Sequence, residues 1–204
     1  MEVINRLITA VMISSLLVAH GYTLEDVDLL ATIMYAENGS TGKTKEENRQ
    51  VLILTGAVVI NRTKQDGWGG DTIKAVLYSP GQYAKSTKDS VGKVKVPSYI
   101  YELSKRILAF GTNIPSYVVY QSTQKNLGYA WKNLAGEYFA CAEKGHLNEG
   151  DDFIAEVFSI DSYIDWNTVN ILGNTDNRGF IGTSMDFIWG NVHSAIVGGL
   201  DLAD

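Results

Sequence analysis

The chain has few of the residues that build covalent or metal-centred scaffolds. It contains one cysteine, three histidines and three prolines among 204 residues. A single cysteine, Cys141, excludes a disulfide within the chain. No cysteine and histidine pair has the spacing of a zinc site. We therefore expect no structural metal site and no cofactor.

The chain also has fewer basic than acidic residues. There are 17 lysines and arginines against 23 aspartates and glutamates, which gives a formal net charge of −6. A polyanion is repelled on average by such a chain, so nucleic acid is not an expected partner. What the chain does have is an apolar content of 45%, enough for one globular domain with a core.

The N-terminal apolar run, residues 7–19, is too short to span a bilayer as a helix, so no transmembrane span is expected. It has the length of a signal-peptide core, but Glu2 and the sequence Leu17-Val18-Ala19 are atypical of one. Two interpretations of residues 1–22 stay open. They form an apolar helix that packs on the domain, or an uncleaved signal-like segment, and the first is slightly favoured.

Two helix starts are clear. Thr23 with Asp26 three residues on predicts a capped helix over residues 24–38, and Gly39 is expected to end it in a left-handed conformation. Thr44 with Glu47 predicts a second, buried helix over residues 45–64. Gly56 in its middle suggests the close approach of another backbone.

The remaining pattern predicts a small α+β domain, mainly helical, with a short antiparallel sheet. We expect a short helix capped by Asp71, a mobile surface loop at 85–96, a helix over 98–111, strands at 116–122 and 136–142, and a loop between them containing Trp131. The predicted domain spans residues 23–142. Residues 143–204 form an extension of unknown role, which begins with a polar hinge and a helical segment at 153–160.

Glu37 is the one residue that does not fit an ordinary helix end. It lies seven residues after Leu30, four after Ile33 and three after Met34, on the apolar face of its helix. Loss of hydration and the negative end of the helix dipole both favour the protonated form of a carboxyl group there. A protonated carboxylic acid is what general-acid cleavage of a glycosidic bond requires. A carboxylate that bends to solvent or pairs with Arg62 or Lys43 is the competing interpretation.

Four blocks of sequence carry a resemblance to a known family. They are "DLLATIMYAENG", "GAVVINRT", "DTIKAVLYSPGQYA" and "YVVYQSTQKNLGYAW…AGEYFAC", in this order. Over residues of about 26–141 the chain resembles the cell wall hydrolase family of the spore cortex-lytic enzyme (SleB) type. The resemblance implies a lysozyme-like fold, cleavage of the peptidoglycan glycan strand, typically as a lytic transglycosylase, and Glu37 as the catalytic acid.

The chain departs from this family in three places. The glutamate is usually followed by Ala-Arg-Gly-Glu, whereas here it is followed by Asn38-Gly39-Ser40-Thr41. The loop to the next helix is longer. The Gly-x-His-x-Phe ending has become Gly136-Glu137-Tyr138-Phe139, so the histidine is missing. The acid is retained, and the substrate contacts are in question.

One acid is enough for a transglycosylase, because the sugar's own 6-hydroxyl closes a 1,6-anhydro ring. A hydrolase would ordinarily need a second carboxylate. The candidates Glu46, Glu47, Asp66 and Asp71 are better explained by helix caps or loop solubility, which favours the transglycosylase route. By match and by chemistry, the expected substrate-binding residues are Asn61, Gln82, Tyr83, Tyr120, Gln121 and Trp131, and Trp68 is a further stacking candidate.

Two further functions compete with this hypothesis. The chain could be a non-catalytic wall-binding or structural component on a degenerate hydrolase scaffold, for instance in a phage tail, with residues 143–204 contacting virion or tail proteins. An amidase acting on the peptide stem is disfavoured, because it needs zinc ligands or a Cys–His pair. Peptidoglycan is the expected partner, and the expected location is the cell wall, the extracellular space or a virion.

Overall fold

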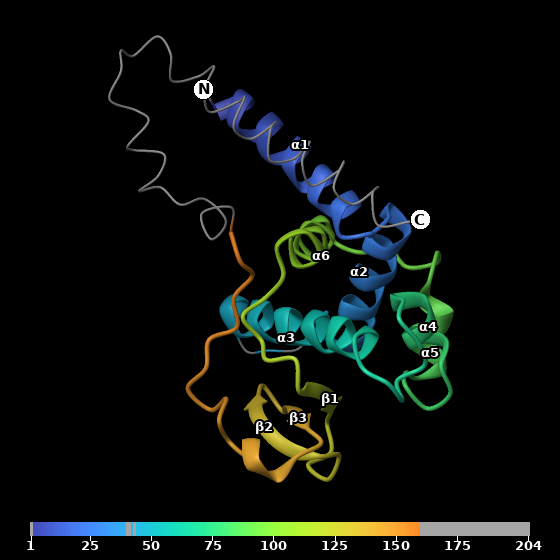
Figure 1. The fold of residues 1–204 in the computed structure, drawn as a ribbon, viewed down its shortest axis with the longest axis vertical. Coiled ribbons are helices and arrows are strands. Elements are labelled where there is room, and N and C mark those ends of the chain that lie inside the picture. Colours follow the sequence, from blue (N-terminus) through green and yellow to red (C-terminus); the bar gives the residue numbers. More distant parts are fainter. Residues whose placement is uncertain (1, 40–41, 43, 160–204) are drawn as a thin grey trace, which may run out of the picture.

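The computed structural model describes residues 2–39, 42 and 44–159 (Figure 1). Helices come first and a sheet follows. The elements are α1 (Glu2–Ala19), α2 (Leu24–Asn38), α3 (Lys45–Thr63), α4 (Ile73–Tyr78), α5 (Lys85–Ser90), α6 (Ser98–Phe110), β1 (Val118–Ser122), β2 (Tyr129–Leu134), β3 (Glu137–Cys141) and the 3-10 turn η1 (Lys144–His146). The predicted α+β class, mainly helical with a short antiparallel sheet, is confirmed.

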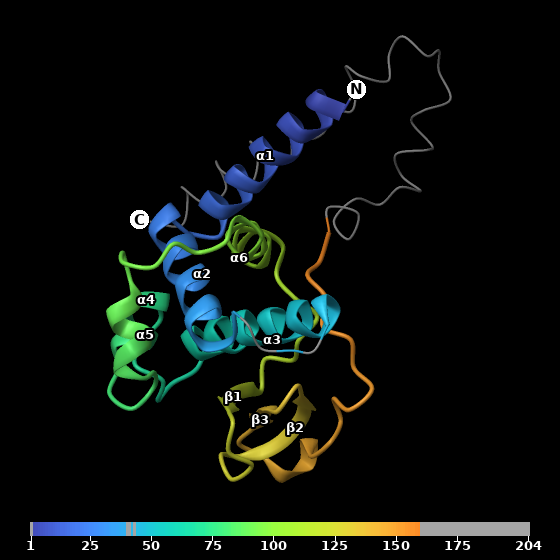
Figure 2. The ribbon, with the colours of Figure 1, turned by 180° about the vertical axis from the view of Figure 1, so that it is seen from behind.

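Helix α3 lies at the centre, between the other helices and the sheet (Figures 1 and 2). Leu52 and Val59 belong to the core that α3 shares with α1, α2 and α6. Val51 and Val58 belong to a second core, shared with Phe139 of β3 and other residues of the sheet. A helix that is apolar on every side must be buried on every side. This explains the long apolar run in the sequence and sets the two-core architecture.

Both predicted capping boxes are present. The backbone N–H of Asp26 donates to the hydroxyl of Thr23 at 3.2 Å, and that of Glu47 donates to Thr44 at 3.1 Å. Each acidic side chain accepts a hydrogen bond from the backbone N–H of its capping threonine. Helix α2 therefore has its predicted bounds, and α3 ends one residue earlier than predicted.

The two glycines singled out in the sequence are needed for space. Gly39 has φ of −61°, so the predicted left-handed conformation is wrong, but a Cβ there would lie 2.3 Å from the Tyr35 ring. A Cβ on Gly56 would lie 2.8 Å from Ile107 Cδ1 and 3.3 Å from Met34 Sδ. The close approach at Gly56 is thus made by side chains of α2 and α6, and not by another backbone.

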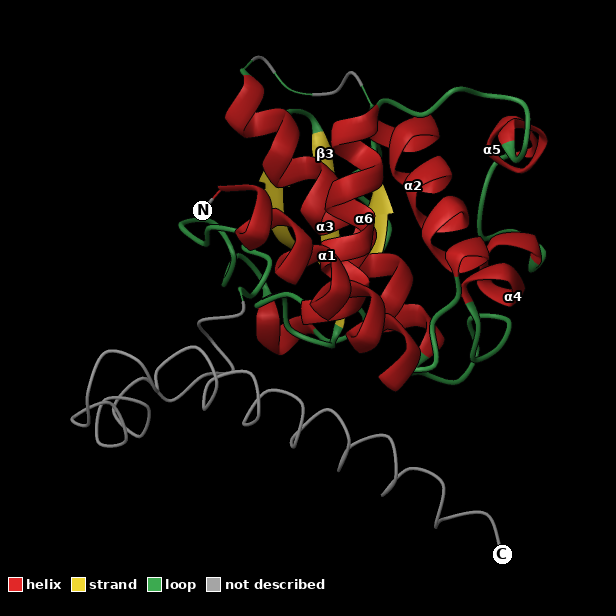
Figure 3. Ribbon diagram, turned by 90° about the horizontal axis from the view of Figure 1, so that it is seen from above, coloured by secondary structure: helices red, strands yellow, loops and turns green. Residues whose placement is uncertain are grey.

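The sheet has the strand order β1-β3-β2 and is antiparallel throughout. Viewed from above, it lies behind α3 (Figure 3). The prediction of a loop around Trp131 is wrong, because β2 covers this region. A bulge between Ala130 and Lys132 places Trp131 in the core, where it is 1% exposed and packs edge-on against Phe153 at 5.0 Å.

Three other local predictions need correction. The polar stretch 85–96 contains helix α5 and is not simply a loop. Helix α4 is capped by the hydroxyl of Thr72, and not by Asp71. Residues 153–159 are not helical, since Val157 forms an isolated antiparallel bridge with Thr112. The rest of the predicted extension, residues 160–204, lies outside the described residues.

The first part of the predicted extension packs into the domain. Gln50 of α3 exchanges two hydrogen bonds with the backbone of Ala155, at 2.6 and 2.9 Å, and Ala155 is fully buried. The buried ammonium of Lys132 donates to the carbonyls of Gly150 and Asp151. Residues 150–155 are therefore a structural part of the sheet core.

At the other end of the chain, α1 packs through Ile13 and Leu17 on the helical core. None of the helices in the described part of the chain combines the length and the hydropathy needed to cross a membrane.

The contact at Gly56 predicts a graded response to side-chain size. Gly56→Leu should lower the free energy of unfolding by about 1–3 kcal/mol, because it overpacks the junction of α2, α3 and α6. Gly56→Ala should stay within about 1 kcal/mol of the wild type, since its helix propensity offsets the displacement of Ile107. Urea denaturation measures both changes. Equal stability of the Leu and Ala variants would show that this junction is not tightly packed.

Candidate functional site

Glu37 lies in the last turn of α2, after the fully buried residues Ile33 and Met34. Its side chain is half-buried, as expected for a carboxyl group on the core-facing side of a helix. The hydroxyl of Thr87 on α5 donates a hydrogen bond to Glu37 Oε1, and Thr87 is itself 3% exposed. The carboxyl group is therefore held in one place by a buried donor.

The residue after the glutamate fixes the end of α2 to α3. Asn38 is 1% exposed, and its Nδ2 donates to Thr55 Oγ1 at 2.9 Å. Thr55 in turn donates to the carbonyl of Val51, and Asn48 Nδ2 donates to the carbonyl of Asn38 at 3.3 Å. Asn38, one of the departures from the resembled family, thus ties the turn that carries Glu37 to the central helix.

A second carboxyl group, Glu137, lies on β3. Alternate residues of a strand share a face of the sheet, so Glu137 lies on the face that carries Phe139 and Cys141. Both of these are fully buried against α3, and Glu137 is 8% exposed. Gln121 of β1 lies opposite Phe139, on the same face of the sheet as Glu137. The sheet therefore directs Glu137 toward the helices.

The negative charge of Glu37 acts on Glu137. Burial is the largest effect on Glu137 and raises its pKa, and the negative charge of Glu37 raises it further. The side-chain amide of Gln121 lowers the pKa of Glu137 and has the smallest of the three effects. Strand β3 thus carries a buried carboxyl group, Glu137, whose ionisation is opposed by burial and by the charge of Glu37.

Aromatic rings and one guanidinium form the adjoining wall. Arg62 of α3 is 5% exposed, and its Nε donates to the carbonyl of Val119 at 2.7 Å. Its guanidinium lies 4.7 Å from the ring of Trp68 and 5.3 Å from that of Tyr83. Tyr120 packs edge-on against Trp68 at 5.0 Å.

Tyr83 connects this wall to Glu37. Its ring contacts the guanidinium of Arg62, and the charge of Glu37 contributes to its raised pKa, of which burial is the main cause. Arg62 and Glu37, both in the described part of the chain, form no ion pair. The competing interpretation of Glu37 as the partner of Arg62 is therefore not what the structure shows.

Of the predicted site residues, Tyr83 lies within the electrostatic reach of Glu37. Gln121 shares a face of the sheet with Glu137, whereas Tyr120 lies on the opposite face and packs against Trp68. Gln82 lies beside Tyr83 in the turn before α5, half-buried, with its backbone N–H bonded to the carbonyl of Ser79. Trp131 is not part of the group. Its buried ring is inaccessible to a saccharide, because the bulge in β2 turns it into the core.

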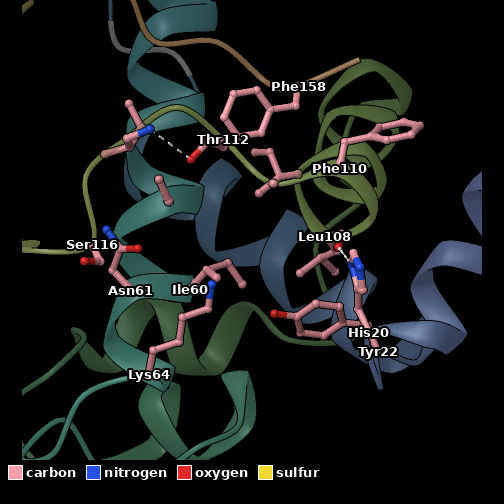
Figure 4. Close-up of a pocket in the computed structure, with 14 residues that line it drawn as sticks. His20, Tyr22, Ile60, Asn61, Lys64, Leu108, Phe110, Thr112, Ser116 and Phe158 are labelled. Atoms are coloured by element: carbon pink, nitrogen blue, oxygen red, sulfur yellow. Dashed lines mark hydrogen bonds between the residues drawn. The ribbon is translucent and has the colours of Figure 1, made fainter. Parts of the chain in front are cut away.

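Asn61 has a structural position. Its Nδ2 donates to the carbonyls of Pro115 and Val118 at 2.8 and 3.0 Å, so both amide hydrogens are occupied in holding α3 to the start of β1 and the chain before it. Asn61 also lines a cavity of about 530 Å³, together with His20, Lys64 and Phe158 (Figure 4). Glu37 and Glu137 are not among the residues that line this cavity.

The lone thiol does not have the features of a nucleophile. Cys141 is fully buried in the sheet core, and burial raises its pKa. Its Sγ lies 3.4 Å from the carbonyls of Tyr129 and Glu143. A buried thiol held among backbone carbonyls packs as a small apolar side chain.

Sequence reasoning missed Thr87 and Glu137. Thr87 lies in a polar stretch with no hydrophobic period, so nothing indicated that it would be buried. Glu137 could have been found, because the strand was predicted and Phe139 and Cys141 mark its buried face two and four residues on.

The contacts of Arg62 predict that lysine, which has the same charge but a different shape, cannot replace it. Arg62→Lys should lower the free energy of unfolding by about 1–3 kcal/mol, because an ammonium cannot both reach the carbonyl of Val119 and stack on the two rings. Urea denaturation measures the change. Arg49→Lys, on an exposed side chain, is the matched control and should stay within about 0.5 kcal/mol. An equally mild effect at Arg62 would contradict the assigned role of the guanidinium.

The chain was compared with protein-family models, with curated proteins and with solved structures, and none of the three searches found a match.

Proposed function

We propose that this chain cleaves the glycan strand of peptidoglycan as a lytic transglycosylase, with Glu37 as the general acid and base. The observation that carries the proposal is the setting of Glu37. A half-buried carboxyl group at the end of α2 is fixed by Thr87 and adjoined by aromatic and amide side chains. This combination suits protonation of a glycosidic oxygen and contact with sugar rings. The resemblance to cell wall hydrolases of the SleB type supports the same assignment.

The reaction needs one proton carrier. Glu37 donates its proton to the oxygen that leaves the anomeric carbon, and the C–O bond breaks with oxocarbenium character at the sugar. The 6-hydroxyl of the same sugar then attacks the anomeric carbon and gives its proton to Glu37. The product carries a 1,6-anhydro ring, and Glu37 returns to its protonated form.

The neighbouring side chains suit the substrate in different ways. The rings of Tyr83 and Tyr120 offer faces for sugar rings, and the planar amides of Gln82 and Gln121 can hydrogen-bond hydroxyl and acetamido groups. Asn61 positions α3 and is assigned no direct contact, because its amide hydrogens are occupied. Such a function belongs at a cell wall, outside the cell or on a virion, with peptidoglycan as the partner.

The test of this proposal is the product. Purified protein is incubated with peptidoglycan, and the released fragments are analysed by mass spectrometry. We expect fragments with 1,6-anhydro-muramyl ends, and Glu37→Gln should reduce their release by at least about 100-fold, because the amide cannot donate the required proton. Glu102→Gln, which changes an exposed helical glutamate, is the matched control and should release fragments at the wild-type rate.

Each alternative predicts a different outcome. Fragments with reducing ends in place of anhydro ends would identify the protein as a hydrolase and not a transglycosylase. Binding of the protein to glycan that stays intact would support a non-catalytic wall-binding component. The extension of such a component could contact virion or tail proteins. Unchanged release by Glu37→Gln would remove Glu37 from the catalytic role.

A further inference from the structure

The cavity beside Asn61 is separate from the site around Glu37. Its volume of about 530 Å³ lies within the range of sites that bind small molecules, and Glu37 is not among the residues that line it. Its walls come from α3, from α6, from the turn between α1 and α2, and from the chain around residues 111–116 and Phe158 (Figure 4). The proposed function makes no use of this cavity.

Contacts between distant segments hold the walls of the cavity. His20 Nδ1 lies 3.4 Å from the carbonyl of Leu108, which joins the turn before α2 to α6. The backbone N–H of Phe158 donates to the carbonyl of Gly111 at 3.1 Å, which holds Phe158 beside the end of α6. The fold itself therefore shapes the cavity, so binding of a ligand would require little ordering of the chain.

Apolar side chains form most of one part of the cavity. Ile60 of α3 lines it together with Ile107 and Leu108 of α6, and the last two are almost fully buried. The rings of Phe110 and Phe158 lie at the same end (Figure 4). An apolar group of a ligand would be removed from water in this part of the cavity.

Two polar side chains extend into the other part from opposite sides. They are Lys64, directly after α3, and Tyr22, shortly before α2 (Figure 4). Between residues of the described part of the chain, neither the ammonium of Lys64 nor the hydroxyl of Tyr22 forms a hydrogen bond or an ion pair. Burial is the main cause of the raised pKa of Tyr22, so its hydroxyl is a hydrogen-bond donor at neutral pH.

The charge at this end of the cavity is positive, although the chain has a formal net charge of −6. Among the described residues that line the cavity, none is acidic. Asp26 acts on Tyr22 electrostatically, but its carboxylate accepts two hydrogen bonds from Thr23 in the cap of α2. The ammonium of Lys64 is therefore available to an anion, and an ammonium with a converging hydroxyl suits the two oxygens of a carboxylate.

From this arrangement we propose that the cavity binds a small amphipathic carboxylate. The carboxylate lies between Lys64 and Tyr22, and the apolar body lies against α6 toward Phe110 and Phe158. The inference does not depend on the proposed function, because it concerns a different part of the molecule.

The first test uses phenylbutyrate, which carries one carboxylate on an apolar body, as the probe. Calorimetric titration into the full chain should give a Kd of about 0.1–1 mM, which is the range expected for so small a ligand. Phenylbutyramide has nearly the same shape without the charge, and it should bind at least about 10-fold more weakly. The amide NMR signals that shift on addition of phenylbutyrate should belong to the residues that line the cavity.

The second test changes the two polar side chains. Lys64→Gln should weaken binding of phenylbutyrate about 10-fold, and Tyr22→Phe should weaken it about 5-fold. Lys64→Arg keeps the charge and should retain most of the affinity. Lys45→Gln, which changes an exposed lysine at the other end of α3, is the matched control and should bind the probe as the wild type does.

Each outcome decides the inference. Selective binding of the acid that is lost in Lys64→Gln supports it, whether or not the protein cleaves glycan. A lysine at the end of a helix can also act only on the helix dipole. In that case Lys64→Gln would be less stable in urea and would still bind phenylbutyrate with the wild-type Kd, which would overturn the inference. Absence of binding at millimolar probe, equal binding of acid and amide, or NMR shifts away from the cavity would overturn it as well.

Discussion

The burial of α3 on every side is the constraint on which the rest of the structure depends. Its apolar side chains divide between a helical core and a sheet core, so helices must cover one side and the sheet must cover the other. Polar residues of α3 are placed where they tie these layers together. Asn61 and Arg62 bind carbonyls before and within β1, and Thr55 binds the side chain of Asn38 at the end of α2.

This arrangement partly or fully buries two carboxyl groups from distant parts of the chain. The end of α2 brings Glu37, and the inner face of β3 brings Glu137. Neither position is favourable for a carboxyl group in an ordinary fold, since both reduce hydration. In the function that we propose, this cost at Glu37 serves proton transfer, because general-acid catalysis needs a carboxylic acid that stays protonated near neutral pH.

Helix caps and amphipathic faces could be predicted from the sequence, but contacts between distant parts of the chain could not. The capping threonines Thr23 and Thr44 set helix starts correctly because a cap acts within four residues. Strand β2 was missed because it contains a bulge and buries a lysine, Lys132, whose ammonium bonds carbonyls of the segment 150–155, and no local pattern encodes this contact. In the site, the amphipathic face located Glu37, while the donor Thr87 lies fifty residues away on a short helix without a hydrophobic signal.

The central claim is that the sheet buries Glu137 and that the negative charge of Glu37 reaches it. The most direct measurement is an NMR titration of the side-chain carboxyl carbon of Glu137, in the wild type and in Glu37→Gln. The account predicts that Glu137 titrates above the ordinary glutamate range in the wild type, and that its curve moves toward acid when the charge at position 37 is removed. A Glu137 curve in the ordinary range that is the same in both proteins would contradict the account.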